Sequence, residues 1–462
     1  MNISIANPYN RQTIGELTLQ TSADANAALG RAKALFDDRA GWLPAQQRMA
    51  ILEKAAALME QRVEELTQIA LREGGKPYAD SRAEVLRAIS GVKVAAAQIP
   101  HLKGEQVPMG LNEASAHRWA YTLREPLGVV VSISAFNHPL NLIVHQTATA
   151  IAAGCPVIVK PAPTTPFSCL NFVKLLEEAG LPQGWCQPMV CDNDTAEKLV
   201  TDPRVGFLSF IGSSRVGWML RSKLAPGTRC ALEHGGAAPV IVDKDVDVAG
   251  IVPTLVKGGF YHAGQVCVSV QRVFVEQSRL TELGNALAEH AQRLVVGDPQ
   301  DPRTEVGPLI TPREVDRVAQ WVDEAVASGA TLLCGGRKIS DTCYAPTVLL
   351  NPPPEAKVST LEIFGPVVCV YGYTDRGQAI RAANALSVHF QAAVFTQNVD
   401  VALDCINRLD ATAVMVNDHT AFRVDWMPFG GRDTSGLGMG GIGYSIEDMT
   451  RIKMMVFKSP VL

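Results

Sequence analysis

The feature that most constrains the fold is a series of short, apolar, β-branched runs that begins after Leu123, each followed by a stretch with helical spacing. The runs span residues 127–134, 155–159, 205–210, 238–242 and 270–275. Short apolar strands that alternate with helices are typical of βαβ units, in which helices cover both faces of a parallel sheet. The sequence therefore predicts an α/β fold with a buried parallel sheet.

The rest of the chain divides into a second series and two flanking regions. The second α/β series runs from about 280 to 409, with strand-like residues at 393–396 and just beyond it at 413–416. Residues 22–97 have a helical pattern. Because 462 residues exceed what one hydrophobic core usually organises, we expect two α/β lobes with a cleft between them.

The composition narrows the range of partners. Apolar residues make up 47% of the chain and charged residues 19%, with a formal charge of -4, so we expect a globular protein that binds neither nucleic acid nor an anionic membrane. The absence of a long apolar run and of a signal-like N-terminal segment predicts a cytoplasmic protein. The ten cysteines form no C-x-x-C pair, so we expect mostly buried, reduced thiols.

One glycine-rich segment imitates a dinucleotide-binding motif. Gly438-Met-Gly-Gly-Ile-Gly443 has the spacing G-x-G-x-x-G, which binds a pyrophosphate when a strand precedes it and a helix follows. Here a polar stretch precedes it, and only 19 residues follow Gly443, which leaves little room for the strand that should carry a ribose-binding acid. We therefore interpret the segment as a surface turn.

Two reactive side chains lie in glycine-rich surroundings beside apolar runs. A thiolate is the reactive form of cysteine, so catalysis by Cys267 needs nearby donors or a helix N-terminus that favour the anion. Glu233 stands just before a double glycine and a strand; if partly desolvated, its carboxylate has a raised pKa and can take a proton from water near neutral pH. From the residues alone, Cys267 can equally be a core cysteine and Glu233 a structural acid.

With these two residues the chain resembles the aldehyde dehydrogenase superfamily. Glu233 is followed by Gly-Gly and a Pro-led strand, and a Gly-Gln-x-Cys segment places Cys267 34 positions downstream, a spacing typical of the family. Further family motifs follow in the expected order over nearly the whole chain.

The resemblance implies a Rossmann-like dinucleotide-binding domain (1–112 and 124–236), an α/β catalytic domain (237–450) and a small β oligomerisation arm (113–123 and 451–462). The two arm segments look strand-like and lie outside either α/β series, so we expect them to pair with another subunit in a homodimer or homotetramer.

Family motifs also imply an oxyanion donor and a cofactor site. Ala135-Phe-Asn-His-Pro139 is similar to the segment whose Asn amide donates to the oxyanion formed after thiolate attack, which gives that role to Asn137. Three more segments, 160–166, 210–217 and 361–367, resemble the cofactor-binding segments. The residues implied are Lys160 for the adenosine ribose, the phosphate turn with Gly212, Ser213 and Gly217, Glu362 for the nicotinamide ribose, and Phe364 beside the ring.

Three positions depart from the common family pattern. Pro163 stands where many NAD-preferring members carry a Glu three residues after the Lys, so no carboxylate at this position repels a 2′-phosphate. Arg215 stands where an acid is common, which is consistent with NADP. Arg432 replaces the commoner Lys of the closing loop. We therefore expect NAD or NADP as the cofactor.

The implied reaction is the oxidation of an aldehyde to a carboxylic acid, with no metal required. The Cys267 thiolate adds to the carbonyl carbon, the Asn137 amide and the Cys267 backbone N–H meet the oxyanion, and hydride leaves for the nicotinamide. Water deprotonated by Glu233 then hydrolyses the thioester. Three alternatives stay open: a CoA-acylating enzyme, although that branch generally lacks this Glu; a non-catalytic scaffold; and a thiol hydrolase that uses His262 as base.

Two residues suggest a polar substrate. His138 follows Asn137 at a position that is usually aromatic, and Arg87 lies in a segment resembling the helix that lines the substrate entrance. We expect both to contact a short, polar or anionic aldehyde, as in the lactaldehyde, semialdehyde and phosphonoacetaldehyde dehydrogenase branches. Val266, directly before Cys267, stands where relatives that bind phosphate with two cations carry an arginine. The alternative is that Arg87 pairs with Glu84 on its own helix and His138 is only a polar wall.

Overall fold

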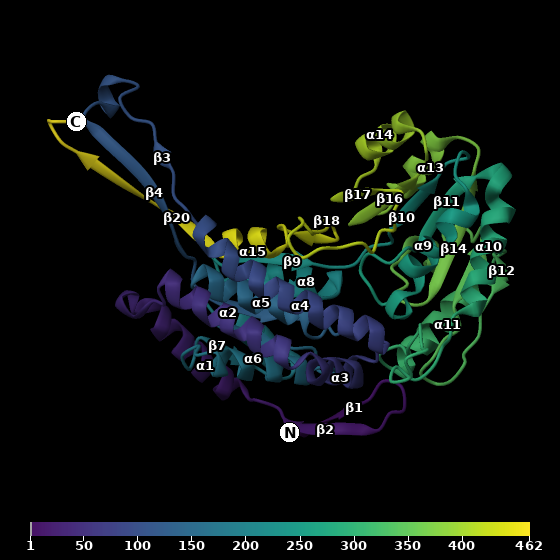
Figure 1. The fold of residues 1–462 in the computed structure, drawn as a ribbon, viewed down its shortest axis with the longest axis horizontal. Coiled ribbons are helices and arrows are strands. Elements are labelled where there is room, and N and C mark those ends of the chain that lie inside the picture. The colour runs from purple at the N-terminus through teal and green to yellow at the C-terminus, as the bar shows by residue number, and fades with distance from the viewer. Residues whose placement is uncertain (1) are drawn as a thin grey trace.

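Residues 2–462 are described here by a computed structural model, in which two α/β lobes lie side by side and an arm extends away from them (Figure 1). The first lobe is built on a six-stranded sheet and the second on a seven-stranded sheet. The predicted α/β class with parallel sheets is confirmed. A hairpin of β1 (Asn2–Ala6) and β2 (Thr13–Thr18) lies along the lower side of Figure 1 and was not predicted.

The six-stranded sheet contains three of the predicted apolar runs. Its order is β19-β9-β8-β5-β6-β7, and only β19 runs antiparallel to its neighbour. The bounds are β5 (Val129–Ile133), β6 (Val157–Lys160), β7 (Cys186–Pro188), β8 (Val205–Ile211), β9 (Arg229–Glu233) and β19 (Gly436–Leu437). β5 and β6 are buried along almost their whole length, as expected for central parallel strands covered on both faces.

The helical stretch predicted at 22–97 forms four helices, and further helices follow the strands. Thr21 and Asp24 form a capping box that starts the first of them. The helices of this lobe are α1 (Ser22–Asp37), α2 (Ala45–Gln61), α3 (Val63–Gly74), α4 (Tyr78–Gln98), α5 (Asn141–Ala153), α6 (Phe167–Glu178), α7 (Asn193–Val200), α8 (Ser214–Ser222) and α15 (Ile442–Asp448). Every residue of α5 is buried because α4 and α15 pack over it.

The register brings four strand ends to one edge of this sheet. Ile133 of β5 pairs with Lys160 of β6 on one side and with Phe210 of β8 on the other, and Ile211 pairs with Glu233 of β9. The chain order reverses between β5 and β8, and ligands of open α/β sheets bind at such a switch point, beyond the carboxyl ends of the strands. The predicted site segments at 135–139, 160–166 and 210–217, together with Glu233, all lie at this edge.

The seven-stranded sheet has the order β12-β13-β14-β11-β10-β16-β17, with only the β12 edge antiparallel. The strands are β10 (Pro239–Val242), β11 (Arg272–Glu276), β12 (Thr331–Cys334), β13 (Thr347–Leu350), β14 (Val367–Tyr373), β16 (Gln391–Phe395) and β17 (Ala413–Val416). The helices are α9 (Val248–Phe260), α10 (Leu280–Arg293), α11 (Pro312–Ala327), α12 (Lys357–Thr360), α13 (Arg376–Ala383) and α14 (Val399–Arg408).

The arm consists of β3 (Gln106–Val107), β4 (Arg118–Pro126) and β20 (Thr450–Lys458), with β4 in the middle. It projects beyond the first lobe at the upper left of Figure 1.

Residues 436–448 belong by contact to the first lobe, because β19 pairs with β9 and α15 packs on α4 and α5. We therefore propose a domain division in which this segment, placed by sequence in the second domain, joins the first.

The glycine-rich segment at 438–443 is only partly a surface turn. Gly438 is exposed, but Gly440 and Gly441 are buried. A Cβ atom at Gly440 would lie 2.3 Å from Oε1 of Glu233, so the glycine allows the chain to pass against this carboxylate. The interpretation as a surface turn was therefore wrong for these two residues, because the tertiary fold packs Gly440 against Glu233 and Gly441 against the backbone of Met427.

Within residues 2–462, every helix is too short or too polar to cross a lipid bilayer.

Candidate active site

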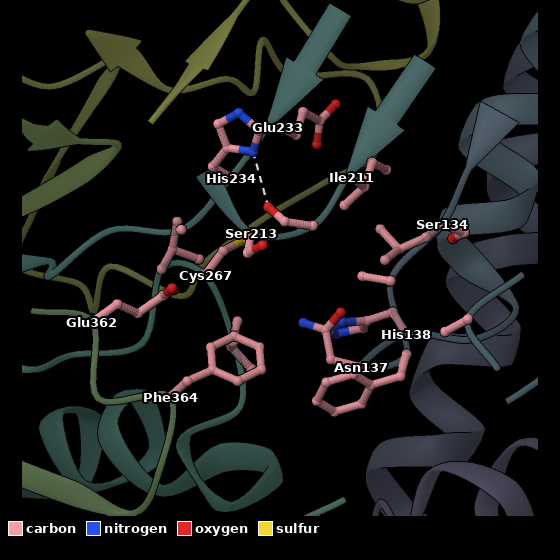
Figure 2. Close-up of a pocket in the computed structure, with 18 of the residues that line it drawn as sticks. Ser134, Asn137, His138, Ile211, Ser213, Glu233, His234, Cys267, Glu362 and Phe364 are labelled. Atoms are coloured by element: carbon pink, nitrogen blue, oxygen red, sulfur yellow. Dashed lines mark hydrogen bonds between the residues drawn. The ribbon is translucent and has the colours of Figure 1, made fainter. Parts of the chain in front are cut away.

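A cavity of about 800 Å³ lies at the carboxyl edge of the first sheet and is closed on its other side by the second lobe. Figure 2 shows Ser134, Asn137 and His138 on one wall and Glu362 and Phe364 on the other. The cavity is lined by the following residues predicted from sequence: Arg87, Asn137, His138, Lys160, Gly212, Ser213, Glu233, Cys267, Glu362 and Phe364. Gly217 is the one predicted residue outside this lining.

Cys267 lies in the loop between α9 and β11. His262 and Ala263, shortly before it, have left-handed backbone conformations with φ of 49° and 54°, which are costly for residues with a side chain. Val266 and Val268 on either side are buried beside Phe390 and Phe429. The buried neighbours hold the loop, and Cys267 itself stays partly exposed to the cavity.

The thiol of Cys267 is neutral in this setting. Burial raises its pKa to about 12, while the guanidinium of Arg423 lowers the pKa and the carboxylates of Glu362 and Glu233 raise it. Eight of the ten cysteines are buried, and only Cys230 and Cys267 are partly exposed. The expectation of mostly buried, free thiols is confirmed for the ten cysteines.

Glu233 is the last residue of β9 and lines the cavity from the first lobe. Burial raises the pKa of Glu233, and the positive charge of Arg423 lowers it. A carboxyl group with a raised pKa is suited to accept a proton near neutral pH. The geometry therefore places a base in the same cavity as the thiol, although the two groups come from different lobes.

Asn137 is buried, and its side chain is held above the loop that carries the thiol. Its Nδ2 donates to the backbone carbonyl of Gln265 at 3.0 Å. Gln265 is itself fixed, because its Nε2 donates to the carbonyls of His262 and Pro308. The Asn137 amide therefore donates to a backbone carbonyl that lies two residues before Cys267.

The cofactor segments form the other part of the cavity. Lys160 is buried at the end of β6, and Gly212 and Ser213 lie between β8 and the first turn of α8. Gly217 has a packing role: a Cβ there would lie 2.0 Å from Cε1 of His234, whose Nδ1 is 2.9 Å from the Gly212 carbonyl oxygen. Gly217 therefore supports the phosphate turn from behind.

Glu362 supplies the observation that tests whether a dinucleotide fits. Its Oε1 is buried and has no hydrogen-bond partner among the described residues, and burial raises its pKa to about 8. A buried carboxyl oxygen without a hydrogen-bond partner is costly, and ribose hydroxyl groups, which both donate and accept, can supply that partner. Phe364 beside it has φ of 47° and packs edge-on against Phe136, at 5.9 Å between ring centroids. The residues present therefore fit a nicotinamide nucleotide.

The sequence reading missed Arg423, which follows β17 and lines the cavity. Its guanidinium stacks on Phe429, with Cζ 3.5 Å from the ring centroid. Its Nε is buried without a hydrogen-bond partner within residues 2–462. The only local signal was an arginine between Phe422 and Val424, which no motif distinguishes from a surface residue.

Arg87 does not form the alternative ion pair with Glu84. Glu84 pairs with Lys76 at 2.7 Å, and Arg87 pairs with Asp425 at 2.8 Å. The alternative was wrong because both partners lie outside the helix. His138 lies near Tyr261, with Nε2 3.5 Å from its hydroxyl, and burial lowers its pKa well below the ordinary value.

His262 is a poor candidate for a base acting on Cys267. Its ring is buried and faces the rings of His138 and Tyr261, at 6.3 and 6.5 Å between centroids. It does not contribute to the lining of the cavity, so far as the described residues show.

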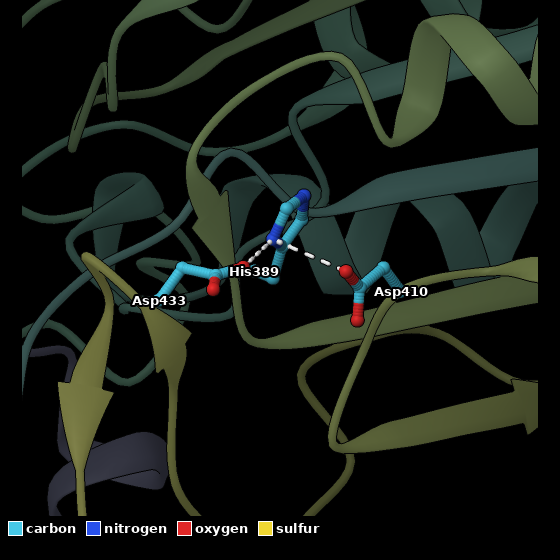
Figure 3. Close-up of side chains that lie close together, drawn as sticks. All are labelled: His389, Asp410 and Asp433. Atoms are coloured by element: carbon cyan, nitrogen blue, oxygen red, sulfur yellow. Dashed lines mark hydrogen bonds and ion pairs between the residues drawn. The ribbon is translucent and has the colours of Figure 1, made fainter.

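A separate cluster lies outside the cavity, where β15 (Val388–His389) pairs with β18 (Arg432–Asp433) (Figure 3). Nδ1 of His389 lies 2.8 Å from Asp433 and 3.7 Å from Asp410. Arg432 donates to the other oxygen of Asp410 at 2.8 Å. The arginine already balances one carboxylate, so we interpret the cluster as a polar contact that fastens the two short strands.

Comparison with known proteins agrees with this geometry. Residues 1–455 match the sequence model of the aldehyde dehydrogenase family. The chain is 37% identical over 455 residues to a 3-sulfolactaldehyde dehydrogenase of Priestia aryabhattai, covering 98% of this chain and 94% of the relative.

Two solved structures extend the comparison. Aldehyde dehydrogenase 21 of Physcomitrella patens, in complex with the reaction product succinate, superposes with a TM-score of 0.96 at 33% identity, covering 99% of this chain and 95% of the other. The glyceraldehyde-3-phosphate dehydrogenase GapN of Methanocaldococcus jannaschii, complexed with NADP, superposes with a TM-score of 0.94 at 32% identity and covers 99% of both chains.

Proposed function

Since the chain belongs to the aldehyde dehydrogenase family and is an NAD(P)-dependent oxidoreductase, we propose that it oxidises a short aldehyde that carries an anionic group. The observation that carries the substrate proposal is the pair of guanidinium groups, Arg87 and Arg423, in the same cavity as Cys267. Arg423 lines this cavity and forms no ion pair with any carboxylate of residues 2–462, so its charge is available to a ligand.

Each catalytic side chain has one task in the proposed reaction. The Cys267 thiol gives up its proton to water and its Sγ bonds to the carbonyl carbon, while the Asn137 amide and the Cys267 backbone N–H donate to the oxygen. Loss of one such donor raises the activation barrier by about 3 kcal/mol. After oxidation to the thioester, Glu233 takes a proton from the attacking water, the carbon–sulfur bond breaks, and the acid leaves.

The cofactor segments described above would hold NAD or NADP, which supplies a two-electron acceptor for the oxidation. Lys160 and Glu362 would bind the two riboses, and the turn at Gly212 and Ser213 would face the pyrophosphate at the N-terminus of α8. Pro163 is exposed and brings no carboxylate to this end of the cavity. We therefore propose that NADP is accepted, as in the NADP complex of the similar GapN.

The comparisons support an anionic substrate. One relative is named for a sulfonated aldehyde, and one structure contains the dicarboxylate succinate as product. Both ligands combine a short carbon chain with a fixed negative charge at the end away from the reacting carbon. Two arginines near the thiol are a suitable partner for this charge.

A substrate panel tests the proposal. Steady-state kinetics would be measured with 3-sulfolactaldehyde, succinic semialdehyde, lactaldehyde and propanal, each with NAD and with NADP. A hydrogen bond to a charged group contributes about 1.5 to 3 kcal/mol, so we expect kcat/KM for the anionic aldehydes to exceed that for propanal by about tenfold or more. Equal values for all four would contradict the substrate class. Dependence on added CoA would instead indicate an acylating enzyme.

A further inference from the structure

We propose that Asp425 is a positioning residue that fixes both cavity arginines, Arg87 directly and Arg423 through the ring of His145. This inference rests on the proposed anionic substrate and concerns how its binding groups are held. Asp425 lies between β17 and α15, and its side chain is only 3% exposed. It reaches neither the thiol loop nor the cofactor segments, and it is not part of the cavity lining.

The Asp425 carboxylate joins its own loop to two helices, α4 and α5. Its Oδ1 accepts from Nη2 of Arg87 at 2.8 Å, from Nδ2 of Asn141 at 3.1 Å and from His145 at 2.8 Å, while Oδ2 accepts from Nε of Arg87 at 3.3 Å. Arg87 belongs to α4, and Asn141 and His145 belong to α5. These contacts orient the guanidinium of Arg87 and leave its Nη1 for a ligand in the cavity.

The hydrogen bond to Asp425 also determines the tautomer of His145. Burial lowers the pKa of this histidine to about 4, so the ring is neutral near neutral pH. A carboxylate can only accept, and therefore Nε2 of His145 carries the hydrogen that is donated to Asp425. Nδ1 is then an acceptor, and Nη2 of Arg423 lies 3.5 Å from it. Asp425 thus makes Nδ1 the ring nitrogen that accepts a hydrogen bond from Arg423.

Asp425 also offsets the positive charge of the two arginines, in addition to orienting them. The two guanidinium groups are close enough that Arg87 lowers the pKa of Arg423, and Asp425 raises it. The two roles, charge balance and positioning, predict opposite changes in anion affinity when Asp425 is removed. Loss of a balancing charge would leave the cavity more positive and bind an anion more tightly. Loss of a positioning group would release Arg87 and Arg423 and bind it more weakly.

The test compares Asp425→Asn with wild type on succinic semialdehyde and on propanal, with thermal unfolding as a check of folding. We expect KM for succinic semialdehyde to rise about tenfold, as when a charged hydrogen-bond partner is lost, and kcat and KM for propanal to change less than about twofold. An unchanged or lower KM for succinic semialdehyde would overturn the inference.

A matched pair at position 145 keeps the test decisive if Asp425→Asn does not fold. Gln can donate to Asp425 and accept from Arg423 at the same time, whereas Leu can do neither. We expect His145→Gln to keep the wild-type KM for succinic semialdehyde and His145→Leu to raise it. The same KM in both variants would overturn the link through His145. If the wild type shows no preference for succinic semialdehyde over propanal, the proposed function is wrong, and the inference that rests on it is wrong too. If the wild type shows the preference but the variants leave KM for succinic semialdehyde unchanged, only the inference is wrong.

Discussion

Arg423 has two effects on the reacting groups, because its charge acts on both the nucleophile and the base. It lowers the pKa of the Cys267 thiol, which burial raises, and it also lowers the pKa of Glu233, which burial raises. The same guanidinium is the proposed anchor for the anionic end of the substrate. Substrate binding and acid–base chemistry are therefore coupled through one side chain.

This coupling predicts a shift in the pH profile. Glu233 must be ionised to take a proton from water, so kcat should rise with pH through the raised pKa of Glu233. Removing the positive charge in Arg423→Met raises that pKa further, and we expect the acid limb of kcat for saturating propanal to move to higher pH. The profile would be recorded for wild type, Arg423→Met and the charge-preserving control Arg423→Lys. An acid limb that stays in place in all three would contradict the coupling.

The sequence identified side chains that belong to motifs and missed those held by distant partners. Cys267, Glu233 and Asn137 were found because family motifs surround them, although their roles stay predictions. Arg423 and Asp425 carry no such motif, and the partner of Arg87 lies 338 positions away in the chain. The residues alone offered the local partner Glu84, because helical spacing is the only geometry that a sequence shows directly.

At the scale of elements, the buried parallel strands were predictable and the short or solvent-facing ones were not. The runs at 205–210 and 238–242 match β8 and β10 within one residue because a strand buried on both faces must be apolar throughout. The two-residue strands β15 and β18 form only because the folded chain brings them together. Helix starts are also fixed by distant groups, since Glu73 of α3 accepts from the backbone N–H groups of Phe167 and Ser168 in α6.

Glu73 therefore provides a test of how α6 is held. It is fully buried, and its carboxylate caps the first turn of α6 at 2.6 and 2.8 Å. Glu73→Ala leaves buried N–H groups without acceptors, and we expect a loss of about 1 to 3 kcal/mol in the free energy of unfolding. Glu73→Gln keeps one acceptor oxygen and should lose less. Denaturant unfolding measures both, and equal stability of the Ala variant and wild type would contradict the capping role.

At the scale of the whole molecule, the arm leaves one strand edge and several apolar side chains uncovered. One edge of β20 is unpaired in the described chain, and its side chains Ile452, Met454 and Val456 are 66%, 54% and 47% exposed. A long apolar edge strand in water is a site for pairing with another chain. We therefore propose that the protein forms homo-oligomers through this strand. The strands β4 and β20 overlap the segments predicted at 113–123 and 451–462, but residues 113–115 form a 3-10 helix and β3 was placed by sequence in the first domain, because two-residue strands carry no sequence pattern.

The oligomer proposal predicts a change in mass without a loss of folding. Replacing Ile452, Met454 and Val456 by Lys should leave the two lobes intact, because these side chains are exposed in the single chain. We expect light scattering after gel filtration to give a smaller assembly than wild type. Lys458→Glu on the same strand is the control for a change of charge alone. A single-chain mass for the wild type would contradict the proposal.

The central claim is that Cys267 carries the acyl group until Glu233 frees it, and the most direct measurement is intact-protein mass spectrometry of Glu233→Gln after mixing with succinic semialdehyde and NADP. The account predicts one acyl group per chain, attached at Cys267, and no adduct in the Glu233→Gln and Cys267→Ser double variant. Acyl attachment at another residue, or normal turnover by Cys267→Ser, would contradict it.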